Sequence, residues 1–76
     1  MSSIYSDEYQ LVIKTLRSAR IELGITQTQL AESLGKPQSF VAKVENGERR
    51  LDVIEFATIA CLLSLDPAEV LNAVMK

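Results

Sequence analysis

Between Thr26 and Asn46 the sequence places two short helical patterns on either side of one glycine, an arrangement that strongly constrains the fold. Thr26 is a residue type that caps helix N-termini. Gly35 can adopt a left-handed backbone conformation that larger residues resist, which predicts a tight turn between the two helices. The apolar positions of both helices can pack together: Leu30, Ala31, Leu34, Val41 and Val44. The pattern predicts a short helix braced across a second one, with its outer side free.

Three further helical patterns flank this pair. Apolar residues recur at spacings of three and four from Tyr9 to Leu23, as on one face of a helix. Asp52 and the pair Asp66-Pro67 are start signals for two more helices. No segment shows the sustained alternation that is typical of a strand. We therefore expect an all-α fold, a single domain over residues 1–76, with five helices at about 7–23, 27–34, 37–46, 53–63 and 67–75.

The apolar run from Phe56 to Leu65 is expected to supply much of the core. In the helix over 53–63 the residues expected to point mostly inward are Ile54, Ala57, Ile59, Ala60, Leu62 and Leu63. Cys61, the only cysteine, is expected to be a buried and inert thiol, because cysteine is among the most buried residue types. A single cysteine excludes an internal disulfide and is compatible with a reducing cytoplasm.

Composition argues against several classes of function. The chain has 76 residues and no histidine, so it lacks the usual general base and the commonest metal ligand. It also lacks a glycine-rich phosphate loop and metal-ligand spacing, and we expect no enzyme activity, cofactor or metal. No apolar segment is long enough to span a membrane, and the N-terminus does not resemble a signal peptide, so a cytoplasmic protein is expected. The net charge of −2 argues against non-specific polyanion binding by the whole surface, but permits a local basic face.

Five pieces of the sequence resemble the Cro and phage-repressor group of helix-turn-helix proteins, the XRE-like family. These pieces are Ile25-Thr26-Gln27, Leu30-Ala31-Glu32, Leu34-Gly35, Gln38-Ser39 and Val44-Glu45-Asn46-Gly47. The resemblance covers about residues 16–71. It implies a sequence-specific regulator of transcription whose helix 37–46 enters the major groove of double-stranded DNA.

The resemblance also implies which residues read base edges: Gln38, Ser39, Ala42 and Lys43. Gln38 suits adenine, Ala42 suits a thymine methyl group, and Lys43 suits guanine or a phosphate. The alternative for Gln38, Ser39 and Lys43 is an ordinary solvated helix surface. Phe40 can read DNA or pack against the protein, and we favour packing.

Phosphate contacts are implied for Gln27, Asn46, Arg49 and Arg50. Solvent exposure without DNA contact is the alternative for Gln27 and the two arginines, and Asn46 can also be a helix-terminal turn residue.

Arg20 and Glu45 are implied to form a structural ion pair, which leaves the window from Lys36 to Arg50 locally positive. Two residues depart from the family pattern. Lys36 replaces an apolar residue, and Pro37, although it suits the first helical position, puts the first-turn DNA contact in doubt.

Members of this family usually bind two half-sites one helical turn apart as two-fold dimers. We therefore expect a homodimeric repressor or autoregulator on a two-fold symmetric operator. The interface candidates are Leu65, Val74 and Met75, assisted by Ile4 and Tyr5, whereas Val70 and Leu71 are expected to close the monomer core. The alternative is an antitoxin-like or other protein-interaction module with DNA binding secondary, which the acidic pI of about 5.0 favours.

Overall fold

The computed structural model describes residues 6–75, and this part of the chain contains five helices and no strand. The helices are α1 (Asp7–Glu22), α2 (Gln27–Leu34), α3 (Gln38–Glu45), α4 (Val53–Leu62) and α5 (Pro67–Val74). The predicted all-α fold is confirmed. Four of the five helices end one residue earlier than the sequence indicates. Pro37 lies directly before α3, with no side-chain capping hydrogen bond, and is not its first helical residue.

Side-chain caps explain where most of these helices begin. Thr26 Oγ1 accepts a hydrogen bond from the backbone N–H of Gln29, whose side chain accepts one from the Thr26 backbone N–H. Asp52 and Glu55 form the same reciprocal arrangement at α4. Each box satisfies two backbone donors that the first helical turn leaves without a partner. The starts of α2 and α4 are therefore fixed locally.

A left-handed residue follows four of the helices: Gly24 after α1, Gly35 after α2, Gly47 after α3 and Ser64 after α4. Gly35 follows α2 with φ +68°, and the next backbone N–H, that of Lys36, donates to the Ala31 carbonyl at 3.0 Å. This closes the turn that the sequence predicts. After α4 the left-handed position belongs to Ser64, at φ +61°, although glycine is the residue that usually occupies it. The sequence pattern did not indicate a turn at Ser64.

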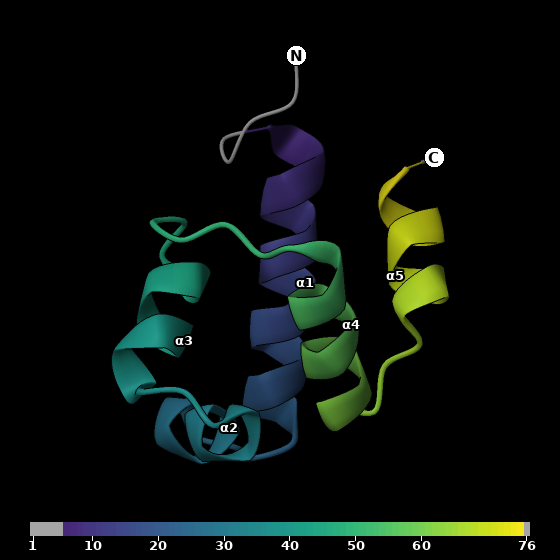
Figure 1. Cartoon of the computed structure of the whole chain (residues 1–76). Helices are drawn as coiled ribbons and strands as arrows, with labels where there is room; N and C mark the ends of the chain where they lie inside the picture. The colour runs from purple at the N-terminus through teal and green to yellow at the C-terminus, as the bar shows by residue number, and fades with distance from the viewer. Residues whose placement is uncertain (1–5, 76) are drawn as a thin grey trace.

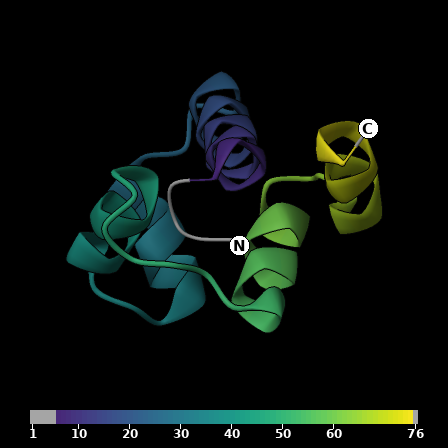
Figure 2. The same cartoon turned by 90° about the horizontal axis from the view of Figure 1, so that it is seen from above.

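The core lies where α1, α2, α3 and α4 meet, and α5 covers α1 and α4. Its apolar residues are Val12, Leu16, Leu30, Ala31, Val41, Phe56, Ile59, Ala60, Leu63 and Val70. In Figures 1 and 2 the pair α2 and α3 lies on one side of α1 and α4, and α5 lies on the other. The side of α3 that faces away from α1 and α4 is therefore not covered by another helix. No helix within residues 6–75 is long and apolar enough to cross a membrane.

Four positions predicted to be buried are exposed. Ile54 is 71% exposed, Leu62 40% and Leu71 43%, and Cys61 is also at the surface. The helix α4 is apolar on nearly all sides, but only one stripe of a helix can face a core of this size. Phe56, Ile59, Ala60 and Leu63 form that stripe. Periodicity could not choose among so many apolar residues. The buried position predicted for Val70 is confirmed. Ile4 and Tyr5 lie outside the described residues.

Candidate nucleic-acid interface

The outer face of α3 carries the four residues that the sequence assigns to base reading. Gln38, Ser39 and Lys43 are exposed and Ala42 is half-buried, whereas Val41 and Val44 on the opposite face are buried. The small side chain of Ala31 is almost fully buried where α2 packs against α3. Because Gly35 turns the chain sharply between them, α3 crosses α2 and presents its outer face to solvent (Figure 1).

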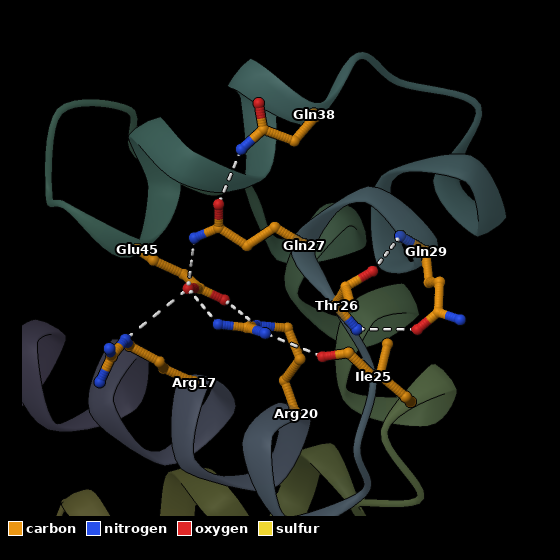
Figure 3. A network of polar contacts seen from close by, with 8 residues as sticks. All are labelled: Arg17, Arg20, Ile25, Thr26, Gln27, Gln29, Gln38 and Glu45. Atoms are coloured by element: carbon orange, nitrogen blue, oxygen red, sulfur yellow. Dashed lines mark hydrogen bonds and ion pairs between the residues drawn. The ribbon is translucent and has the colours of Figure 1, made fainter.

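Behind this face, Glu45 ties α3 to α1. The Arg20 Nε and Nη2 atoms donate to the two Glu45 carboxylate oxygens at 2.7 Å and 3.0 Å, and Nη1 donates to the Ile25 carbonyl at 2.8 Å (Figure 3). The two side chains are only 11% and 7% exposed. A bidentate arginine–carboxylate pair fixes orientation as well as distance. Arg17, which is mostly exposed, lies further away at 3.8 Å.

A hydrogen-bonded chain continues from Glu45 to the start of α3. Gln27 Nε2 donates to Glu45 Oε1 at 2.9 Å, and Gln38 Nε2 donates to Gln27 Oε1 at 2.8 Å. Figure 3 shows the Gln38 carbonyl oxygen pointing away from Gln27. The Gln38 amide therefore keeps one N–H and its oxygen for an external partner, which is the donor and acceptor pair that adenine requires.

These hydrogen bonds bear on the interpretation of Gln27. The sequence assigns its side chain to a phosphate, but the amide spans Glu45 and Gln38 in the structure. Nothing in the spacing of the sequence indicated the bond between Gln27 and Gln38, which are eleven residues apart. The phosphate contact of Gln27 stays a prediction, and the backbone N–H groups at the N-terminus of α2 also favour an anion there.

The loop after α3 holds the remaining residues assigned to phosphates. Asn46 is the exposed C-cap of α3. The Arg49 guanidinium forms an ion pair with Glu55 at 2.9 Å and also donates to the Arg50 carbonyl. The Arg50 guanidinium lies 6.0 Å from the centre of the Tyr9 ring. The Tyr9 hydroxyl accepts a hydrogen bond from the Leu51 N–H, so α1 anchors this loop next to α3.

The packing of Phe40 agrees with the sequence prediction, since it is partly buried against the core cluster. Glu55 is the residue that the sequence analysis missed, although its position three residues after the Asp52 cap is a recognisable signal for a capping box. Among the described residues no cluster of acidic or cysteine side chains could hold a metal ion.

Comparisons with known proteins agree with this geometry. Residues 16–70 match the family model for the helix-turn-helix. Among solved structures, an XRE-family like protein from Pseudomonas syringae pv. tomato str. DC3000 is 48% identical in sequence, with a TM-score of 0.84. The match covers 90% of this chain and 83% of that one. A search of curated proteins found no match.

Proposed function

This chain belongs to the helix-turn-helix family of DNA-binding transcription regulators, and we propose that it is a dimeric repressor or autoregulator that reads a two-fold symmetric operator with α3. One observation carries the proposal. The hydrogen-bonded chain from Arg20 through Glu45 and Gln27 orients the exposed Gln38 amide before any DNA is bound. A reading group that is already oriented loses less side-chain freedom when it binds.

The four residues on the outer face of α3 have different roles in this proposal. Gln38 pairs with adenine at N6 and N7, Ala42 contacts a thymine methyl group, and Lys43 donates to guanine or to a phosphate. Ser39 is compatible with either kind of base pair. A bidentate contact of the Gln38 kind contributes about 1–3 kcal/mol of discrimination against the wrong base.

The reading face is the outer face of α3, with Gln38, Ser39, Ala42 and Lys43. Phosphates of the operator are held on both sides of it. On one side lies the N-terminus of α2, which begins at Gln27. On the other lie Asn46, Arg49 and Arg50 in the loop after α3. These contacts set the register of α3 on the duplex and make the affinity dependent on salt, but they carry no sequence information of their own.

The proposed dimer uses the end of the molecule where α1 begins and α5 ends. An open depression there is lined by residues that include Tyr9, Val12, Leu71, Val74 and Met75. Met75 is 69% exposed, whereas Val74 is partly buried. In Figure 1 the same end carries the loop between α3 and α4. A two-fold axis at this end can therefore leave both copies of α3 facing one side of the duplex.

Leu65 has less support as an interface residue. It precedes α5, at the other end of that helix from Met75, and packs partly against the core. The proposal therefore centres on Val74 and Met75, with Leu71 added because of its exposure.

Selection from a randomised duplex library at about physiological salt tests the function directly. We expect enrichment of a two-fold symmetric sequence with half-sites about 10 base pairs apart. The Gln38→Ala variant should lose the preference at one base pair of each half-site and keep the others. A folded protein that enriches no sequence would contradict the proposal.

A second candidate function is a protein-interaction module, and the outer face of α4 favours it. Ile54, Cys61 and Leu62 are all exposed on this helix. Scattered apolar residues are common on surfaces, but these three together with the exposed Val53 on one short helix are compatible with a protein partner. A partner that still binds after Gln38 and Lys43 are both changed to alanine, while DNA binding is lost, would support this second function alongside the first.

A further inference from the structure

The Phe40 ring lies close to two cations, Lys36 and Arg49, that are not part of the hydrogen-bonded network behind α3. The Lys36 Nζ atom is 5.3 Å from the centre of the Phe40 ring, and the Arg49 guanidinium carbon is 5.1 Å from it. Both distances are within the range in which a cation is attracted to an aromatic ring. The three residues come from the turn before α3, from α3 itself and from the loop after it. The ring therefore brings two charges together that are thirteen positions apart in the sequence.

The position of Phe40 on α3 places this cluster beside the reading face. Successive residues of a helix are rotated by about 100°, so residues three apart are neighbours on its surface. Phe40 is three residues before Lys43, at the edge of the reading face, and its ring packs partly against the core. It thus occupies the flank between the exposed and the buried sides of α3.

A helix in the major groove has the phosphate backbone of one DNA strand on each of its flanks. The groove is about 12 Å wide and a helix with its side chains is about 10–12 Å across, so the two flanks of α3 must come close to the two strands. The flank next to Glu45 carries Gln27 and the start of α2. The opposite flank carries Lys36, Phe40 and Arg49.

We propose that Lys36, Phe40 and Arg49 form a binding site for the phosphodiester backbone of the DNA strand that borders the major groove on this flank of α3. In this site Lys36 and Arg49 contact phosphate oxygens, and Phe40 is a positioning residue that holds both cations at the flank of α3. The inference rests on the proposed function and adds Lys36 and Phe40 to its DNA-binding residues.

An aromatic ring is suited to this positioning because it orients a cation without cancelling its charge. A carboxylate orients a cation too, but neutralises it. Arg49 experiences both effects, since Glu55 pairs with it on the side of α4. Lys36, in contrast, is exposed, and the side-chain contact that the structure gives it is the one with Phe40. We therefore expect Lys36 to depend on the ring more strongly than Arg49 does.

The salt dependence of DNA binding tests the site. On B-DNA the logarithm of affinity falls with the logarithm of salt concentration by about 0.9 for each phosphate that the protein neutralises. We expect Lys36→Gln to make this slope shallower by about one, with the affinity falling to a similar degree on operator and mixed-sequence duplexes. Phe40→Leu retains both charges and an apolar side chain, but we expect it to make the slope shallower as well.

Lys14→Gln is the matched control, because Lys14 is an exposed lysine of α1 on a different surface, next to Leu65. It should keep the wild-type slope. Thermal unfolding followed by circular dichroism checks that Phe40→Leu is folded, and Lys36→Gln tests the site independently of the core. A wild-type slope in Lys36→Gln overturns the inference while operator selection still supports the proposed function. A wild-type protein that binds no duplex at all overturns both.

Discussion

Replacing Glu45 separates the two roles of its ion pair with Arg20, which are stability and the orientation of Gln38. In Glu45→Leu the buried Arg20 guanidinium loses both of its hydrogen bonds to Glu45. Of its present hydrogen bonds it keeps the one to the Ile25 carbonyl. Removing one member of a buried pair costs about 3–5 kcal/mol, because the other charge is left without compensation. Small domains have a total stability of about 5–15 kcal/mol, so a large part of it would be lost.

Arg20→Met should cost less than Glu45→Leu. Its loss leaves Glu45 with the Gln27 amide, and the Arg17 guanidinium is already 3.8 Å away. In the double variant both charges are absent and two apolar side chains occupy the space. Replacement of a complete buried pair by apolar residues is often neutral or stabilising. We therefore expect the double variant to regain most of the stability that Glu45→Leu loses.

The base preference should not return with the stability. In the double variant Gln27 Nε2 has no Glu45 oxygen to donate to, so the Gln27 oxygen no longer has a fixed orientation toward Gln38. The assays are urea unfolding for stability and library selection for the base pair that Gln38 reads. Arg17→Gln is the control, because its partly exposed pair should contribute at most about 1 kcal/mol. A double variant as unstable as Glu45→Leu, or one that keeps the wild-type base preference, would refute this reasoning.

Three further changes test the fold and the assembly. Thr26→Ala removes the capping box of α2 and should lower the free energy of unfolding in urea by about 0.5–2 kcal/mol. Thr28→Ala, at an exposed position of the same helix, is the control and should be close to neutral. Equal losses of stability in the two variants would contradict the role of the cap. In Gly35→Ala the added Cβ has no atom within 4 Å, but the residue must keep a left-handed backbone. The expected loss of stability, about 1–2 kcal/mol, therefore comes from the backbone conformation alone. An unchanged urea midpoint would exclude that cost. Met75→Asp should shift sedimentation from dimer to monomer without unfolding the chain, and a wild-type protein that is monomeric at all concentrations would remove the dimer proposal.

Local chemistry explains why so much of the fold could be predicted from the sequence. Thr26, Asp52 and Asp66 mark helix starts because their side chains satisfy backbone donors within three residues. Gly35 marks a turn because of its own backbone freedom. These signals act over short distances and do not depend on tertiary structure. The boundaries consequently agree with the structure to within about one residue.

The parts that could not be predicted depend on which faces meet. An apolar helix such as α4 contains no local information on which of its sides is covered, and so Ile54 and Cys61 were assigned to the core. The bond between Gln27 and Gln38 likewise exists only because α3 crosses α2 at that point. The pair Lys36 and Phe40 is different. Its spacing of four residues was a usable signal, but Lys36 was interpreted only as a departure from the family pattern.

The distribution of acidic residues explains how a chain with net charge −2 can present a DNA-binding surface. Acidic side chains occupy the first turns of α1, α4 and α5, where they complement the positive ends of these helices. The first turns of α2 and α3 contain none, and their caps, Thr26 and Pro37, are uncharged. The two helices whose N-termini face the proposed operator therefore keep their positive ends for DNA. Glu45, at the end of α3, is compensated by Arg20. The net charge thus mainly reflects how the helices other than α2 and α3 are stabilised, and among these acidic residues Glu55 also pairs with Arg49 beside the reading face.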